Sequence, residues 1–490
     1  MRANVRLHGV QRASAELGVS RHTLWRFLER SQAGRAVPRA VLAAIGDSVA
    51  ALEAATARVI AATVAVSDTG ALSRATAPPP HGERATLLTL CATPLTSVAE
   101  LARFTRVPAT TLRDRLTKLA GKGLVDVVAH RLDCLGPQPQ RRYFPTAAGI
   151  GAAARSKPGI YTFLWTRPVS RRWFRLLTNR LDAVAVLYRV AALVADADEH
   201  HQPVRVEHYR LGPYDMRVTL ANGVTIGVLR QGATLPSSHL RYRLRSAEKL
   251  PYFERPTITL VIACSDQANR RAVRTLGHPV AHMTLFVATE HDVLAGDQRT
   301  RAWQRCGGGL ANNPPVEIAP EASLQHILRW GGKLLEHETR EYGFTPKPIS
   351  LVDDGLRATM PAPPEQVRAA LAVQLSPAEK QSLDLLAAWP LATTAQVAGL
   401  LGGVTRRRVN QVLRSLRRRG LVRTLAKHHV LTDAGLTHLA RRDRAAERIA
   451  VGRWSPRPWR PRPGAARGVA GRARRTKAAP RRPPGARTPR

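Results

Sequence analysis

The hydrophobic pattern between residues 374 and 444 predicts three helices followed by a two-stranded hairpin. Apolar residues recur at three- and four-residue intervals and then give way to two short apolar runs around a polar tip at 426–429. Ser376 and Thr405 are suited to cap the first and third helices, and Gly420 is suited to end the third. The expected elements are helices from 377 to near 390, at 393–401 and at 406–419, and strands at 421–425 and 430–432. This order is typical of a winged helix-turn-helix.

The third of these helices has a strongly basic outer face. Val409, Val412, Leu413 and Leu416 fall at the spacing of a buried stripe, so the opposite face points to solvent. Arginine pairs with guanine edges and phosphates, and Asn or Gln pairs with adenine, so this face predicts a reader of the DNA major groove. A solvated basic face and a winged helix that contacts protein are the alternatives. The predicted DNA-binding residues are Arg406, Arg407, Arg408, Asn410, Gln411, Arg414 and Arg418, with Lys427 and His428 at the wing tip.

Residues 82–156 repeat this layout. Thr146-Ala147-Ala148-Gly149 matches Thr432-Asp433-Ala434-Gly435, because each follows a second wing strand and opens a helix. The pattern therefore predicts an internal duplication, with a first winged helix at 82–156 and a second at 374–444. The expected elements of the first are helices at 83–93, 97–105 and 109–121, strands at 124–129 and 142–146, and a wing at 131–140.

The third helix of the first repeat makes a weaker DNA reader than its later copy. Its buried stripe places Thr110, Asp114 and Thr117 outward, and the acidic residue repels phosphate. The sequence leaves two roles open, which are phosphate binding and a dimer contact. The candidate cationic contacts of this repeat are Arg113 and Lys118 on the helix and Arg131, Arg141 and Arg142 on the wing.

Residues 170–345 alternate between helix and strand, which predicts an α/β domain. The strands near the end of this region are strongly apolar, as expected for a sheet that is covered on both faces. The expected elements are helices at 171–195, 237–250, 266–276 and 323–338, and strands at 204–211, 214–220, 224–230, 257–264 and 283–288, with a loop-rich stretch at 296–320.

The remaining segments are predicted to connect or flank these domains. Residues 1–66 are expected to be helical, with a short helix-turn-helix or an ordinary helical hairpin at 9–30. Residues 67–81 and 346–373 are expected linkers, because proline and small residues dominate them. Residues 445–490 form a low-complexity basic tail that cannot bury a core and is predicted to be disordered.

Composition favours nucleic acid as the partner. The 490-residue chain carries a net charge of +41, which predicts binding to a polyanion. Its four cysteines are scattered, so the sequence indicates neither a disulfide framework nor a zinc site, and a cytoplasmic location is expected. No apolar run is long enough to span a membrane. We expect no metal or cofactor, with double-stranded DNA as partner and a homodimer as a compatible assembly.

The order of elements at 170–345 resembles that of a restriction-endonuclease-like core. In such cores an acid at the second strand and the acid of an acid-x-Lys set on the third hold a magnesium ion, and the Lys supports the attacking water. Asp215 stands in the first position, with Glu207 upstream, but Val228 and Arg230 replace the later acid and lysine. With these residues, the chain over about 82–345 resembles the replication-relaxation family. The resemblance implies a winged helix joined to a nuclease-like domain and a setting in plasmid or DNA replication.

Together these patterns predict a multidomain α+β and α/β protein, in which winged helices flank a restriction-endonuclease-like core. The expected function is sequence-specific binding of double-stranded DNA, in replication control of a plasmid or mobile element or in transcription regulation. Because of Val228, the core is expected to lack catalytic residues. Two alternatives remain, a metal-dependent nuclease or nicking factor centred on Asp215 and a protein-binding adaptor.

Overall fold

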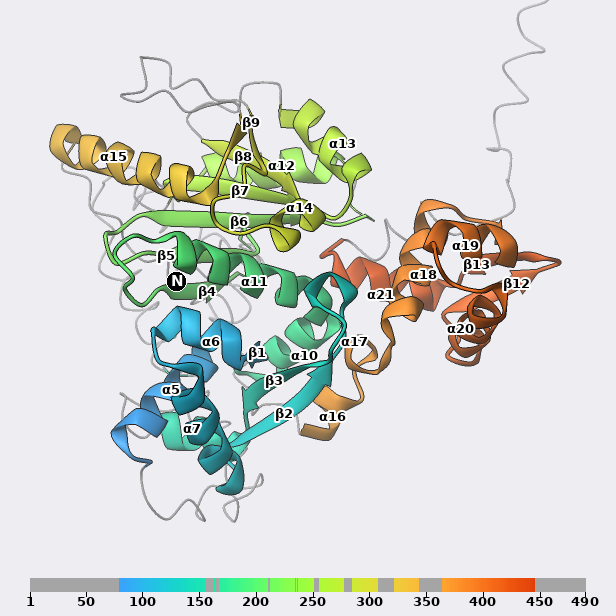
Figure 1. Cartoon of the computed structure of the whole chain (residues 1–490), viewed down its shortest axis with the longest axis horizontal. Helices are drawn as coiled ribbons and strands as arrows, with labels where there is room; N and C mark the ends of the chain where they lie inside the picture. The colour runs from blue at the N-terminus through green and yellow to red at the C-terminus, as the bar shows by residue number, and fades with distance from the viewer. Residues whose placement is uncertain are drawn as a thin grey trace, which may run out of the picture.

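The computed structural model describes residues 79–154, 163, 167–209, 212–233, 235, 237–250, 255–276, 284–306, 321–342 and 364–445. These residues form a mixed α/β structure with three sheets, as the sequence pattern predicted (Figure 1). The helix-turn-helix expected near the N-terminus and nearly all of the basic tail lie outside the described residues. No helix within the described ranges is both long and apolar enough to cross a bilayer.

The central sheet has seven strands in the order β10-β9-β8-β7-β6-β5-β4. Strands β4, β5 and β6 form an antiparallel meander, β6, β7 and β8 are parallel, and β9 and β10 add antiparallel edges. The bounds are β4 Arg205–His208, β5 Met216–Thr219, β6 Thr225–Gln231, β7 Ile258–Ala263, β8 Leu285–Thr289, β9 Trp303–Cys306 and β10 Glu321–Ala322.

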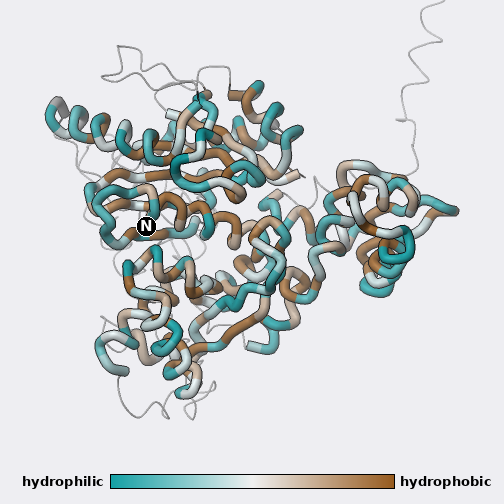
Figure 2. Tube along the Cα trace, in the orientation of Figure 1, coloured by the Kyte–Doolittle hydropathy of each residue, from teal (hydrophilic) through white to brown (hydrophobic). Residues whose placement is uncertain are grey.

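Helices cover both faces of this sheet, so every residue of the central strands β6, β7 and β8 is buried, and most of these residues are apolar (Figure 2). One face packs against α12 (Ser237–Glu248) and α13 (Asp266–Leu276). The other face packs against α11 (Leu181–Ala197) and α15 (Leu324–Tyr342). A short helix, α14 (Glu290–Ala295), follows β8.

Three sequence predictions about this region require correction. The helix expected at 171–195 is two helices, α10 (Arg171–Asn179) and α11, because Arg180 leaves the helical conformation (φ −113°, ψ 15°) and pairs with Asp215. The stretch expected to be loop-rich contains β9. The second half of the expected linker at 346–373 is helical, with α16 (Pro364–Arg368) and α17 (Leu371–Gln374).

The first three-helix unit closely follows the predicted pattern. Its sheet has the order β1-β3-β2, and its last helix packs behind that sheet. The bounds are α5 His81–Ala92, β1 Thr96–Ser97, α6 Val98–Thr105, α7 Ala109–Gly121, β2 Val125–His130, β3 Gln140–Pro145 and α8 Ala147–Ala154, with a short 3-10 helix, η1, at Asp133–Leu135.

The second three-helix unit has the same plan, with the sheet order β11-β13-β12. Its hydrophobic core forms a cluster of its own, whereas the core of the first unit is continuous with α11 and the central sheet. The bounds are α18 Pro377–Ala388, β11 Ala392–Thr393, α19 Thr394–Leu401, α20 Arg406–Arg418, β12 Val422–Leu425, β13 His428–Leu431 and α21 Asp433–Arg442.

The two units share individual backbone contacts as well as element order. Gly123 and Gly420 both follow the third helix with positive φ (68° and 69°), a conformation that glycine adopts without strain. Thr146 and Thr432 both donate from their hydroxyl groups to the carbonyls of these glycines, at 2.7 and 2.5 Å. The contacts therefore align the two units residue by residue at the third helix and the hairpin.

Candidate nucleic-acid interface

Helix α20 is built as the sequence pattern predicted. The Thr405 side chain accepts a hydrogen bond from the backbone N–H of Arg408 and so caps the helix. Its inner stripe is buried, with exposed fractions of 4% or less at Val409, Val412, Leu413 and Leu416. This packing fixes the rotation of the helix and therefore determines which side chains face solvent.

The outer face of α20 carries positive charge without neutralising partners. The stretch from Thr405 to His428 contains nine Lys or Arg residues and no Asp or Glu. Arg406, Arg407, Arg414 and Arg418 are exposed, and none of them forms an ion pair within the described part of the chain. Asn410 and Gln411 are exposed beside them, and Arg408 donates to Gln411 Oε1 at 3.2 Å. The face therefore combines free cations with amide groups, the combination that groove recognition requires.

Arg406, Arg407 and Arg408 occupy the first turn of α20. The partial positive charge at a helix N-terminus makes cations unfavourable there by roughly 0.3–1 kcal/mol each. No acidic residue lies in this turn to offset the repulsion. The same arrangement produces a strongly positive local potential with free backbone N–H groups, which favours a bound phosphate.

The hairpin beside α20 is tighter than the predicted wing. Strand β13 begins at His428, so the turn consists of Ala426 (φ 52°) and Lys427 rather than four residues. Lys427 is exposed at this turn, and His428 is half-buried. Arg423 lies exposed on β12 and adds a cation that the sequence prediction missed, although strand alternation would have placed it outward.

The first unit presents a weaker surface. Arg113 and Lys118 are exposed on α7, but Asp114 is exposed between them. Arg141 is exposed on β3, and its guanidinium lies over the ring of Tyr143, 5.9 Å from the centroid.

Arg142 was predicted as a DNA contact, and this prediction is wrong because its side chain is fully buried. Its guanidinium pairs with Glu100 at 3.1 Å and donates to the Leu95 carbonyl at 3.1 Å. The adjacent Arg141 is exposed, because successive residues of a strand point to opposite faces. Arg142 therefore stabilises the interior of the first unit.

The β2–β3 hairpin of the first unit, where the wing was predicted, also packs inward. His130, at the end of β2, lies 2.7 Å from the Asp182 carboxylate of α11 and accepts from the Arg142 guanidinium at 3.2 Å. Lys380 of α18 donates to the same Asp182 oxygen at 2.6 Å and to the Arg131 carbonyl at 2.8 Å. Burial lowers the pKa of His130 to about 4. Burial alone would raise the pKa of Asp182, but His130 and Lys380 hold it below its usual range.

Asp215 does not have the surroundings of a metal ligand. Its buried carboxylate pairs with three guanidinium groups, at 2.8, 3.0 and 3.2 Å, and accepts from the backbone N–H of Arg230 at 2.8 Å. Burial alone would raise the pKa of Asp215, but these cations hold it well below the usual range. A metal ion would have to displace guanidinium groups that already satisfy this carboxylate. The pairing residues are Arg180, Arg243 and Arg444.

The end of α21 fills the region where the resemblance implied a nuclease site. Arg230 of β6 pairs with Asp443 at 3.0 Å and with Glu290 at 2.6 Å. The predicted carboxylate position, Val228, is buried and pairs with Met216 of β5. The central sheet therefore uses this corner to dock the second three-helix unit.

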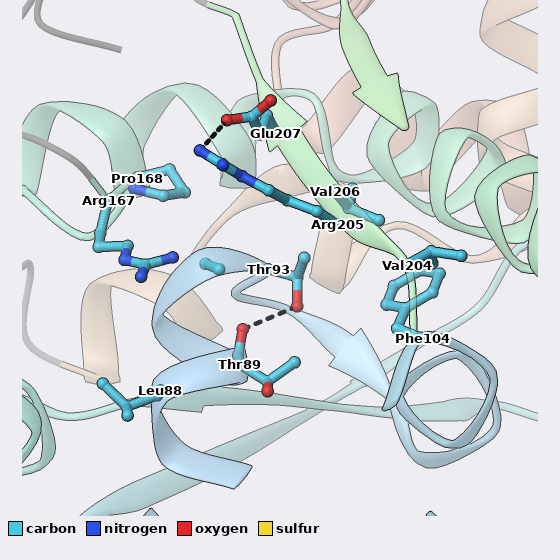
Figure 3. A pocket seen from close by; sticks show the side chains of 11 residues that line it. Leu88, Thr89, Thr93, Phe104, Arg167, Pro168, Val204, Arg205, Val206 and Glu207 are labelled. Atoms are coloured by element: carbon cyan, nitrogen blue, oxygen red, sulfur yellow. Dashed lines mark hydrogen bonds and ion pairs between the residues drawn. The ribbon is translucent and has the colours of Figure 1, made fainter. Parts of the chain in front are cut away.

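Glu207 lies in a different environment from Asp215, although the sequence pattern grouped them. It lines a cavity of about 480 Å³ between α5, α6 and β4, together with Arg167 and Arg205 (Figure 3). Arg205 pairs with its carboxylate at 2.5 Å, and burial raises the pKa of Glu207. Glu207 and Asp215 thus bind different arginines and do not form one carboxylate pair.

No protein-family model, curated protein or solved structure matches the chain.

Proposed function

We propose that this protein binds double-stranded DNA in a sequence-specific manner, with α20 in the major groove and the β12–β13 hairpin against the backbone. The observation that carries the proposal is the outer face of α20, where exposed arginines have no carboxylate partner within the described residues. A merely solvated helix face usually mixes charges of both signs. The exposed amides of Asn410 and Gln411 add groups that can pair with adenine edges.

We also propose that the two three-helix units are winged helices and that the central domain is a restriction-endonuclease-like core. Both three-helix units have the element order of winged helices, and the stretch from α11 to β8 has that of a restriction-endonuclease-like core. The contacts of Asp215 with three arginines favour a scaffold over a nuclease. A cytoplasmic role in replication control of a plasmid or mobile element, or in transcription regulation, rests on the resemblance to replication-relaxation proteins.

The test is a titration of the full chain against duplex DNA at several salt concentrations. Each neutralised phosphate contributes about −0.9 to the log–log slope, so about six contacts predict a loss on the order of 10³-fold between about 50 and 200 mM salt. Arg414→Ala should make the slope shallower by about one. Arg241→Ala is the charge-matched control, because Arg241 is exposed on α12 of the central unit.

Two results would count against DNA binding. Binding that does not change with salt would exclude a phosphate-dominated interface and favour the protein adaptor. Equal effects of the Arg414 and Arg241 variants would show that the charge of the whole chain, rather than α20, attracts the DNA.

A further inference from the structure

The two three-helix units present an equivalent face, formed by the turn between the first and second helices and by the second helix, in two different environments. Leu95 and Leu391 occupy equivalent turns between the first and second helices, and both lie in the left-handed region (φ 67° and 68°). The helices that follow, α6 and α19, both begin with a capping box. Counted from these leucines, Phe104 of α6 corresponds to Leu400 of α19, and Pro94 corresponds to Pro390.

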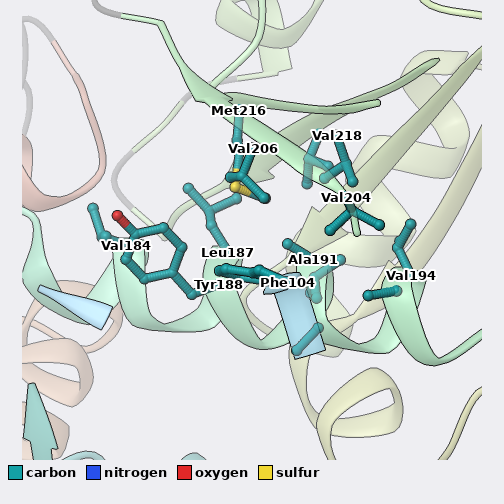
Figure 4. Packing of buried hydrophobic residues seen from close by; sticks show 14 of the residues in the cluster. Phe104, Val184, Leu187, Tyr188, Ala191, Val194, Val204, Val206, Met216 and Val218 are labelled. Atoms are coloured by element: carbon teal, nitrogen blue, oxygen red, sulfur yellow. The ribbon is translucent and has the colours of Figure 1, made fainter. Parts of the chain in front are cut away.

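In the first unit this face is covered by α11. The Tyr188 hydroxyl donates to the Pro94 carbonyl at 2.8 Å, and the Tyr188 ring meets the Phe104 ring edge-on at 6.1 Å between centroids (Figure 4). Arg103 of α6 pairs with Asp196 of α11 at 2.6 Å. Phe104 is only 2% exposed, and Leu95, in the turn before α6, is fully buried.

In the second unit the equivalent face is open. Leu391 and Leu400 are 49% and 48% exposed, and Trp389 beside them is 60% exposed. These residues line an open apolar groove of about 460 Å³ along α19. In Figure 1, α18 and α21 lie between α19 and the central sheet. The groove therefore has the position of the covered face of the first unit, and no helix among the described residues covers it.

We propose that Trp389, Leu391 and Leu400 form a self-association surface, on which the same surface of a second copy docks. Residues 385–405 contain no charged side chain, in a chain with a net charge of +41. Two copies can therefore meet here without bringing like charges together. In the first unit, Arg103 forms the ion pair with α11. Its equivalent in the second unit is Gly399, so this face cannot form the same ion pair with an acidic helix.

Residues 446–490 do not resemble the helix that covers the first unit. Helix α11 is rich in Ala, Val and Leu. The segment from 451 to 490 contains 13 basic residues, eight prolines and no acid, a composition unsuited to an apolar helix. When the same surface of two identical chains meets itself, the result is a closed, two-fold dimer, which is the most common arrangement of homodimers.

The size of the surface and the charge of the chain determine the expected dimer affinity and its dependence on salt. A stable interface buries about 1,600 Å² in total, and a patch around three large side chains falls below this, so a weak, micromolar dimer is expected. Added salt screens the repulsion between the two basic chains. Self-association should therefore strengthen as salt rises, which is opposite to the salt dependence of DNA binding. The proposed self-association does not depend on DNA binding, because it is measured in the absence of DNA.

The test is analytical ultracentrifugation of the full chain without DNA, from about 1 to about 100 μM, a range chosen for micromolar affinity. The wild type should dimerise, more strongly at high salt, and Trp389→Ser/Leu400→Ser should weaken dimerisation more than tenfold. Leu425→Ser is the matched control, because Leu425 is 40% exposed on the hairpin and lies outside the groove. Leu400→Asp and Leu400→Arg should each abolish dimerisation, and their mixture should restore it.

A photo-crosslinker at position 396, on the exposed edge of the groove, identifies the occupant. Crosslinks between copies would support the proposal. Crosslinks to residues 1–78 of the same chain would overturn it in favour of an internal cover. A wild type that remains monomeric at the highest concentration, or a double variant that dimerises normally, would also overturn it.

Discussion

The two three-helix units have the same backbone plan and differ in what their surfaces touch. In the first unit, Arg142, His130 and Phe104 all point to buried partners, and its core merges with that of α11 and the central sheet. In the second unit the third helix and the α19 groove face solvent, and the core is separate. The comparison shows that the same backbone plan is packed against the rest of the chain in one unit and leaves its third helix and second helix exposed in the other.

The largest expected difference between the two units is the loss of unfolding free energy when Arg142, or its equivalent in the second unit, is replaced by alanine. Arg142 pairs with Ser97 across the β1–β3 ladder, and His428 pairs with Thr393 in the same place. Arg142→Ala would leave the buried Glu100 without its cation, which should cost about 3–5 kcal/mol of unfolding free energy. His428→Ala removes a half-buried side chain and should change it by less than about 0.5 kcal/mol. Chemical denaturation monitored by circular dichroism gives both values. Equal losses of unfolding free energy would contradict the claim that this position stabilises the interior of the first unit alone.

The buried end of the β2–β3 hairpin in the first unit predicts that the stability of the protein is sensitive to acid. Because the pKa of His130 is lowered from 6.5 to about 4, the unfolded chain binds the proton first as pH falls. The neutral histidine thus contributes stability that is complete above pH 6.5 and is lost towards pH 4, by about 3 kcal/mol. The thermal midpoint should fall over this window, and His130→Gln should reduce the fall. An unchanged fall in the variant would assign it to His208 and His438, which are also buried with lowered pKa values.

Two glycines test whether the copies share one backbone. A Cβ at Gly149 would clash with the Leu124 carbonyl oxygen, and a Cβ at Gly435 would clash with the Leu421 carbonyl oxygen. Gly149→Ala and Gly435→Ala should therefore each destabilise their unit by about 1–3 kcal/mol. Hydrogen exchange, which resolves the two units separately, measures both losses. A loss in one unit alone would show that the packing of the strand against the last helix differs between them.

Local patterns predicted the second unit well. The stripe through Val409 and Leu416 and the cap at Thr405 are properties of a single helix, so its rotation and exposed face could be inferred from sequence. The alternation along β3 could also have separated buried Arg142 from exposed Arg141.

Features created by distant partners could not be predicted in this way. The break at Arg180 depends on Asp215, which lies on another element. Asp215 itself resembled a catalytic acid because it stands at the second predicted strand of the α/β region, while its three cations come from α12, from the residue before α11 and from the end of the second unit. Likewise, the packing of the β2–β3 hairpin depends on Lys380, far along the chain.

The most direct test gives the third helix of the second unit, α20, the outer face of the third helix of the first unit, α7. Counted back from Gly420 and Gly123, positions 407, 411 and 414 correspond to Thr110, Asp114 and Thr117. The variant Arg407→Thr/Gln411→Asp/Arg414→Thr gives α20 the face of α7 while its buried stripe stays intact. Its affinity for a preferred duplex, selected from random DNA, should fall more than tenfold, a loss above about 1.4 kcal/mol. Arg113→Ala/Lys118→Ala in α7 should change affinity less than threefold, and the opposite ranking would contradict the assignment of α20 as the DNA reader.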